Sequence, residues 1–244
     1  RTATYAAYHA EHKTRGIVYL PVTSYIEMNE WTLPAPAAHD LSALIRQEKD
    51  AGHFERNKAF LRGGIWRNFF SRYPESNWMH KRMLALSQRL AALPPSTHSA
   101  SLTEKLYRAQ ANDAYWHGLF GGLYLPHLRR AVWHNLVGLE AALDAASPRP
   151  PITCADVDHD GHDEIFMRNA DLQAVIRLDG HAAPHEFDSY ALTHNFGDTL
   201  RRSDEHYYAR FAAAQPAISS EGIASAHERI SFKHRLTAHD IIPD

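Results

Sequence analysis

The spacing of the apolar residues changes once along this chain, at the proline-rich stretch SPRPP, residues 147–151. Before it, over residues 39–146, apolar residues recur with the period of an α-helix. After it they alternate with other residues, as over residues 172–179, which is typical of antiparallel β-strands. SPRPP is therefore predicted to be a stiff linker between a helical bundle and a β-region, so the fold class is α+β.

Two apolar stripes define the bundle. The first belongs to a helix that carries Lys81, Arg82 and Arg89 mostly off the stripe, and the second follows Pro126, which suits the first turn of a helix. The first stripe is Met79, Met83, Leu86, Leu90 and Leu93; the second is Leu128, Val132, Leu136, Leu139 and Leu143.

A third helix is predicted between these two. Ser101 and Glu104 have the spacing of a capping box, so the helix should begin near Leu102 and run toward Trp116. Gly118, Gly121 and Gly122 follow and are expected to loosen or end it.

Both ends of the chain have strand character. Residues 16–28, GIVYLPVTSYIEM, hold a β-branched and aromatic run stopped by Pro21, which predicts one buried strand. A strand needs neighbouring strands, so its partners are expected either in the last third of the chain or in a missing N-terminal portion. Residues 227–244 read as a further strand that stops abruptly, as in a sheet with strands missing. The chain also opens on Arg1 rather than methionine, which suggests an excerpt of a longer polypeptide.

Composition narrows the class of protein. The formal charge of -2 provides no broad basic field for nucleic acid. No apolar run reaches the roughly 18 residues needed to cross a membrane, so no membrane partner is expected. One cysteine, Cys154, excludes an internal disulfide framework and fits a reducing compartment. A cytoplasmic protein is the expectation.

The most unusual stretch is ANDAYWHGLFGGLYLPHLRR, residues 111–130. If the helix continues through it, Asp113, Trp116 and His117 share one face. An acid beside an indole suits a sugar, because the ring covers the C–H face of a pyranose and the carboxylate accepts from its hydroxyls. Two alternatives stay open: Trp116 and Phe120 are core residues with Asp113 at a helix end, or Asp113 and His117 bind a metal, for which a third ligand is lacking.

A second polar motif lies after the linker. Asp156, Asp158, Asp160, Gly161 and Glu164 form D-x-D-x-D-G-x-x-E, a spacing in which alternating carboxylates curl around calcium. The motif lacks the bidentate glutamate of an EF-hand, so an acidic β-turn is the alternative. Calcium, if bound, is predicted to be structural. No cofactor is otherwise required.

Four segments together resemble family-57 glycoside hydrolases, the amylase and 4-α-glucanotransferase group. ANDAYWHGLFGGLYLPHLRRAVWHNL and FLRGGIWRNFFSRYPESNWMHKRMLALS resemble parts of the family's helical domain. SYIEMNEWTLP resembles the exit from its catalytic barrel, and DVDHDGHDEIFM with FGDTLRRSDEHYY its C-terminal β-sandwich domain. The resemblance implies a fragment: residues 1–36 end a (β/α)7 barrel with its last strand, 37–147 form the helical domain, and 148–244 begin a truncated sandwich.

The resemblance also implies the chemistry. Family members process α-1,4-glucans with retention, using a glutamate nucleophile and an aspartate acid/base that would lie upstream of this chain. Asp113 would hydrogen-bond the sugar near the cleavage point, and Trp116 would stack on a neighbouring glucose. Glu27 and Glu30 are not expected to be catalytic, since no barrel supports them here. The substrate would be a maltooligosaccharide or longer α-glucan.

Several choices stay open at the level of sequence. Transfer and hydrolysis are not distinguished, because they differ in whether a glucan or water accepts the glycosyl group. The alternative to an enzyme is a non-catalytic carbohydrate-binding or scaffold fragment, which would need the same Asp113 and Trp116. A homodimer is also compatible with the sequence.

Overall fold

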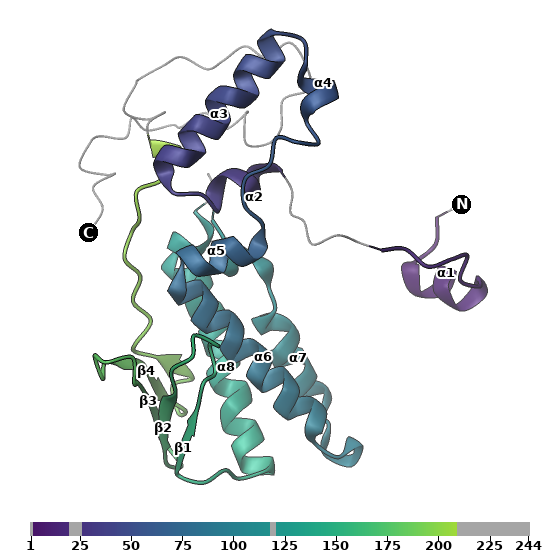
Figure 1. Cartoon of the computed structure of the whole chain (residues 1–244). Helices are drawn as coiled ribbons and strands as arrows, with labels where there is room; N and C mark the ends of the chain where they lie inside the picture. Colours follow the sequence, from purple (N-terminus) through teal and green to yellow (C-terminus); the bar gives the residue numbers. More distant parts are fainter. Residues whose placement is uncertain (1, 20–25, 118–120, 209–244) are drawn as a thin grey trace.

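The computed structural model describes residues 2–19, 26–117 and 121–208. Within these residues helices come first and an antiparallel sheet follows, which confirms the predicted order (Figure 1). The α-helices are α1 (Tyr5–Glu11), α2 (Ile26–Trp31), α3 (Ala35–Asp50), α4 (Phe54–Asn57), α5 (Trp66–Arg72), α6 (Pro74–Ala92), α7 (Ala100–Ala109) and α8 (Pro126–Ala146). Short 3-10 turns are η1 (Pro95–Thr97), η2 (Asn112–Tyr115) and η3 (Gly122–Tyr124). The strands are β1 (Ile152–Ala155), β2 (Glu164–Arg168), β3 (Leu172–Arg177), β4 (Pro184–Ser189) and β5 (His194–Asn195).

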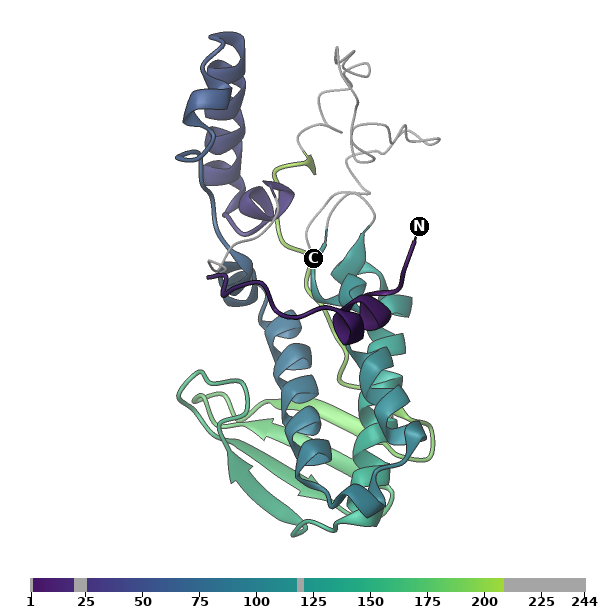
Figure 2. The same cartoon turned by 90° about the vertical axis from the view of Figure 1, so that its right-hand side faces the viewer.

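Helices α6, α7 and α8 pack side by side as the centre of the bundle (Figures 1 and 2). Both predicted stripes face its core: most of their residues are buried, with Leu93 and Leu128 partly buried at the ends. Pro126 occupies the first turn of α8, as expected. Arg82 differs from the prediction, because its side chain is only 3 % exposed despite its charge.

Helix α7 begins and ends earlier than the sequence predicted. Ser99 is its N-cap and accepts a hydrogen bond from the Leu102 amide at 3.2 Å, so the expected capping box at Ser101 is wrong by two residues. Ser99 has the extended backbone that an N-cap needs, whereas Ser101 already lies inside the helix. Glu104 pairs instead with Arg108 on the next turn, at 2.7 Å.

The strands β1 to β5 form a meander in chain order, each antiparallel to the next. The sheet lies against α6 and α8 (Figure 2). The period of two in β3 is confirmed, but its buried face is the unexpected one. Gln173 and Val175 are fully buried, while Leu172 and Leu178 are about two-fifths exposed, at 39 % and 42 %.

The predicted strand over residues 16–28 is not found in the described part of the chain. Ile17, Val18 and Tyr19 are exposed and in no strand, and the residues from Ile26 on are helical. A β-strand needs a neighbour for its backbone hydrogen bonds, and no described segment pairs with this one. Residues 20–25, Gly118, Phe120 and the strand expected over residues 227–244 lie outside the described residues.

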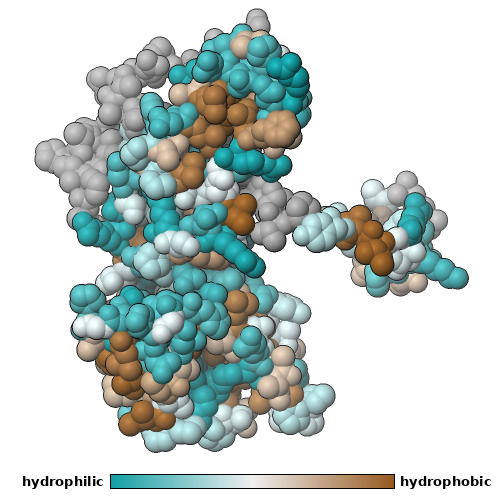
Figure 3. All heavy atoms as spheres, in the orientation of Figure 1, coloured by the Kyte–Doolittle hydropathy of each residue, from teal (hydrophilic) through white to brown (hydrophobic). Residues whose placement is uncertain are grey.

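No helix in the described ranges is both long and apolar enough to cross a bilayer. Apolar surface is nevertheless present, and Figure 3 shows it gathered near α3 and α4 and on the N-terminal segment. Leu44 and Phe60 contribute in the first region, at 44 % and 82 % exposed. Tyr5, Ile17 and Tyr19 contribute in the second, where each is nearly fully exposed.

Candidate functional site

The acid and indole predicted to bind sugar lie on a turn rather than on a helix. α7 ends at Ala109, and Asp113 belongs to the 3-10 turn η2. Trp116 has an extended backbone, with φ of -144° and ψ of 179°. The expectation that Asp113, Trp116 and His117 share a helical face is therefore wrong. Asn112 and Asp113 explain the break, because such side chains compete with helical hydrogen bonds and favour turns.

Asp113 and Trp116 are nevertheless brought together, through the side chain of Asn112. The Asn112 amide nitrogen donates to the Asp113 carboxylate at 3.2 Å, and the amide oxygen accepts from Trp116 Nε1 at 2.9 Å. One planar group thus joins the acid to the indole. Asn112 was not among the predicted site residues, although adjacent Asn and Asp residues are typical of turns.

Trp116 is partly buried and rests on a second tryptophan. Its ring stacks on Trp31 of α2, with centroids 5.1 Å apart and planes inclined by 18°. Trp31 itself is only 4 % exposed. Asp113, in contrast, is exposed. The structure therefore places Trp116 at the border between core and surface, and Asp113 at the surface beside it.

His117 follows Trp116 and is completely buried. Its Nε2 lies 2.6 Å from the Tyr73 hydroxyl and 3.3 Å from the Glu205 carboxylate. Its Nδ1 lies 3.2 Å from the Tyr207 hydroxyl. These contacts show a structural histidine, and among the described residues the alternative of a metal pair with Asp113 gains no third ligand.

Glu205 is the centre of the same network, and the sequence analysis missed it. It accepts from Tyr73 and, at 2.6 Å, from Tyr124, and it pairs with Arg72 at 3.0 Å. Burial opposes its charge, but the close approach of His117 and the charge of Arg72 keep its pKa below the ordinary value. Burial also lowers the pKa of His117, which is therefore neutral near pH 7.

Glycines close the turn over these residues. Gly121 and Gly122 both have positive φ, at 95° and 51°, which side chains rarely adopt. A Cβ at Gly122 would overlap the Trp116 carbonyl oxygen and lie 2.8 Å from His117 Cα. The Leu123 amide donates to that same carbonyl at 2.7 Å. Because α7 has already ended at Ala109, Gly121 and Gly122 do not end this helix as expected; they shape the loop that follows it.

Three of the four predicted calcium ligands come together in the loop between β1 and β2. Carboxylate oxygens of Asp156, Asp158 and Glu164 lie within 4.8 Å of one another. Asp160 is not in this group; its side chain accepts from the His162 amide at 2.8 Å and faces Arg177 at 3.8 Å.

The electrostatics of this loop show carboxylates crowded together. Burial, together with the neighbouring Asp158 and Asp160, raises the pKa of Glu164 to about 7. Burial and Asp160 also raise the pKa of Asp158. Gly161, with φ of 93°, provides the sharp turn. An oxygen-only donor set of this kind fits a hard cation such as calcium.

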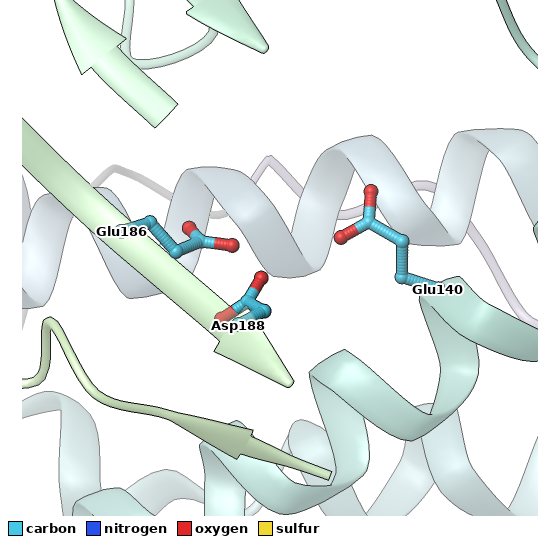
Figure 4. A group of neighbouring side chains, drawn as sticks. All are labelled: Glu140, Glu186 and Asp188. Atoms are coloured by element: carbon cyan, nitrogen blue, oxygen red, sulfur yellow. The ribbon is translucent and has the colours of Figure 1, made fainter. Parts of the chain in front are cut away.

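A second carboxylate cluster lies between the bundle and the sheet (Figure 4), and the sequence analysis did not predict it. Glu140 of α8 faces Glu186 and Asp188 of β4, and all three are buried. Arg82 binds both glutamates, reaching Glu186 at 3.0 Å. The guanidinium occupies the place between the carboxylates, so this cluster joins two elements and does not suit a metal.

Glu30 links three parts of the described chain. Glu30 accepts from Ser42 at 2.9 Å and faces His206 at 3.1 Å, which connects α2 to α3 and to the segment near Glu205. These contacts give Glu30 a structural role, and the expectation that Glu27 and Glu30 are not catalytic stays a prediction.

Comparison with known protein families now identifies the chain. Residues 64–143 match the family model for the middle domain of α-amylase/4-α-glucanotransferase, and residues 156–244 match the model for its C-terminal region. The chain belongs to this family. The resemblance to family-57 enzymes drawn from the sequence is therefore confirmed, and the linker at residues 147–151 falls between the two matched regions.

Individual relatives agree. The chain is 43 % identical over 224 residues to a 4-α-glucanotransferase of Thermococcus kodakarensis, covering 92 % of this chain and 33 % of the relative. It is 42 % identical to an α-amylase of Pyrococcus furiosus, covering 92 % and 32 %. The crystal structure of a 4-α-glucanotransferase from Thermococcus litoralis superposes with a TM-score of 0.68 at 43 % identity, covering 84 % of this chain and 31 % of that one. The chain thus spans about a third of the length of its relatives.

Proposed function

We propose that this chain is part of an α-1,4-glucan-processing enzyme, a 4-α-glucanotransferase or α-amylase. The observation that carries the proposal is the family membership together with the Asp113–Asn112–Trp116 group at the surface of the bundle. Its relatives include both a 4-α-glucanotransferase and an α-amylase. The helical region would supply this group to the substrate cleft, and the catalytic carboxylates would lie in the part of the enzyme that precedes it.

The chemistry of Asp113 and Trp116 suits a glucose unit. The exposed carboxylate of Asp113 would accept hydrogen bonds from sugar hydroxyls, which are stronger when the acceptor is charged. The Trp116 ring would cover the apolar face of a pyranose. The Trp116 ring stacks on Trp31, and its Nε1 donates to the Asn112 side chain. The Trp116 side chain would therefore lose little conformational freedom when it binds a sugar.

The full-length enzyme would act by a retaining double displacement. One carboxylate attacks the anomeric carbon while the other protonates the leaving oxygen, and the acceptor then releases the glycosyl group from the enzyme. Residues of the present chain would bind and orient the glucan but take no part in breaking the bond. Whether glucan or water is the acceptor decides between transfer and hydrolysis.

The domain division follows the same proposal. Residues 1–36 would lead out of the catalytic barrel, 37–147 form the helical domain, and 148–244 begin a β-sandwich. Support for the sandwich comes from the outer face of the sheet, where Ile152, Phe187 and Phe196 are 65 %, 45 % and 56 % exposed. A second sheet would cover such a face.

Two finer proposals concern calcium and location. We propose a structural calcium at Asp156, Asp158 and Glu164, with Asp160 as the fourth residue of the motif, supported by the crowded carboxylates and by the turn at Gly161. The exposed free thiol of Cys154 supports a cytoplasmic location, because reducing compartments preserve such thiols. A homodimer stays a prediction.

Incubation of the full-length enzyme with maltotriose tests the proposed function. A transferase is expected to produce longer maltooligosaccharides, and a hydrolase to produce glucose and maltose, both resolved by chromatography of the products. Maltotriose recovered unchanged, from a folded protein given both maltotriose and longer glucans, would contradict the enzymatic proposal and leave a carbohydrate-binding role.

A further inference from the structure

One buried carboxylate connects the two tryptophans of the candidate site. Arg72 donates to the Trp31 carbonyl oxygen at 3.0 Å and to the Glu205 carboxylate at 3.0 Å. On the other side, His117, which directly follows Trp116, lies 3.3 Å from the same carboxylate. Glu205 therefore contacts Arg72, which binds the Trp31 backbone, and His117, which follows Trp116 in the chain. It lies far from both tryptophans in sequence.

The donors and acceptors in this network determine where its protons lie. Tyr73 has one hydroxyl proton and donates it to Glu205, so the Tyr73 oxygen must accept from His117 Nε2–H. His117 Nδ1 then carries no proton and accepts from the Tyr207 hydroxyl at 3.2 Å. Burial lowers the pKa of His117, in agreement with a neutral ring. In this assignment both ring nitrogens of His117 are used, and its orientation is fixed.

The network also limits how the backbone near Trp116 can move. The Leu123 amide donates to the Trp116 carbonyl oxygen, and Tyr124, on the same turn η3, donates to Glu205 at 2.6 Å. Loss of the Glu205 charge would leave Arg72, which is partly buried, without its ion-pair partner, and would weaken the bonds from Tyr73 and Tyr124. Both the turn that carries Trp116 and the helix that carries Trp31 would lose a common anchor.

We propose that Glu205 and His117 are positioning residues for glucan binding, an inference that rests on the proposed function of Asp113 and Trp116. Glu205 fixes the Trp31 backbone through Arg72, and it fixes the Trp116 backbone through Tyr73, which holds His117. The two stacked rings thereby hold one orientation before the sugar arrives. Neither residue contacts the glucan in this account; both act through the indole of Trp116.

The test compares two buried glutamates in the full-length enzyme. Glu205→Gln removes the charge at the network. Glu186→Gln is the matched control, because Glu186 is also buried, binds an arginine, and accepts from an aromatic donor, Trp78 Nε1, at 2.9 Å, but lies in the sheet. For each variant, the melting temperature and the affinity for maltoheptaose are measured. Trp116→Ala provides the reference for loss of the site.

The proposal predicts that both glutamine variants melt earlier, but that only Glu205→Gln binds maltoheptaose about tenfold more weakly. In Glu205→Gln the KM would rise as the affinity falls, while kcat would change little because the catalytic carboxylates are elsewhere. Wild-type affinity in Glu205→Gln, or an equal loss in Glu186→Gln, would overturn the positioning role. If Trp116→Ala itself binds normally, the proposed site fails, and the positioning role fails with it.

Should Glu205→Gln not fold, Tyr207→Phe provides the same test with a smaller change. This variant keeps the ring and removes only the hydroxyl that His117 Nδ1 accepts from. The expected result is a melting temperature near that of the wild type and about threefold weaker binding of maltoheptaose. Unchanged binding in Tyr207→Phe would count against His117 as a positioning residue.

Discussion

At the scale of single residues, Asn112 determines how the two candidate sugar-binding residues are placed. Its amide both donates to Asp113 and accepts from Trp116, so one side chain sets the spacing of two others. An amide both donates and accepts hydrogen bonds, whereas an ionised carboxylate at this position could only accept them. The geometry of the candidate site therefore depends on Asn112 as well as on the two residues that it joins.

Gly122 is a position at which both the backbone conformation and the close packing exclude a side chain. Gly122→Ala would hold an unfavourable φ of 51° and overlap the Trp116 carbonyl oxygen. We expect a loss of about 2–4 kcal/mol in the free energy of unfolding, measured in urea. Gly52→Ala is the control, since its φ is 70° but nothing lies within 4 Å of its Cβ position. It should cost only about 1 kcal/mol. Equal losses would mean that close packing at Gly122 is unimportant.

Calcium binding is tested at Asp158. Millimolar calcium should raise the melting temperature of the wild type by several degrees, as for any ligand that binds only the folded state. Asp158→Asn should abolish this shift, whereas Asp163→Asn, at an exposed position of the same loop, should keep it. Because the pKa of Glu164 is about 7, calcium must displace a proton at lower pH, so the shift should grow between pH 6 and pH 8. An identical melting temperature in calcium and in chelator would refute the site.

At the scale of elements, local patterns predicted more than long-range ones. The stripes of α6 and α8 were correct because a helix face depends on residues three and four apart. The end of α7 was missed because turn-forming side chains at Asn112 and Asp113 outweighed the expected continuation. The buried face of β3 was reversed because Gln173 is satisfied there by carboxylates from α8 and β4, which alternation alone does not reveal.

The contact between bundle and sheet should show a pH dependence through Asp188. Burial and the adjacent Glu186 raise the pKa of Asp188 to about 11, against about 3.9 for an unfolded aspartate. Between these values the folded protein holds one more proton than the unfolded one, so this residue lowers stability as pH rises. Asp188→Asn does not titrate and keeps an amide donor toward Glu186. It should be the more stable protein at pH 8.

Urea unfolding between pH 5 and pH 9 measures this effect. The wild type should lose up to roughly 1.4 kcal/mol per pH unit more than Asp188→Asn. Asp171→Asn, at an exposed aspartate beside β3, is the control and should follow the wild type. Parallel curves for Asp188→Asn and the wild type would show that Asp188 does not hold a proton in the folded state.

At the scale of the whole molecule, the order of the domains could be predicted from the sequence, but the contacts between residues far apart in the chain could not. The linker, the bundle and the sheet follow from periodicity, and the resemblance to family-57 enzymes follows from long motifs. The Glu205 network was beyond prediction, because its partners come from α5, η3 and the segment after β5, and their proximity exists only in the fold. The strand expected near residue 16 has no described partner, since pairing also depends on distant chain.

The central claim is that this chain contributes a sugar-binding indole to a glucan-processing enzyme. The most direct measurement is the affinity of the full-length enzyme for maltoheptaose after Trp116→Ala, with Tyr107→Ala, 66 % exposed on α7, as the control. The account predicts roughly tenfold weaker binding for Trp116→Ala and no change for Tyr107→Ala. Wild-type affinity in a folded Trp116→Ala protein would contradict it.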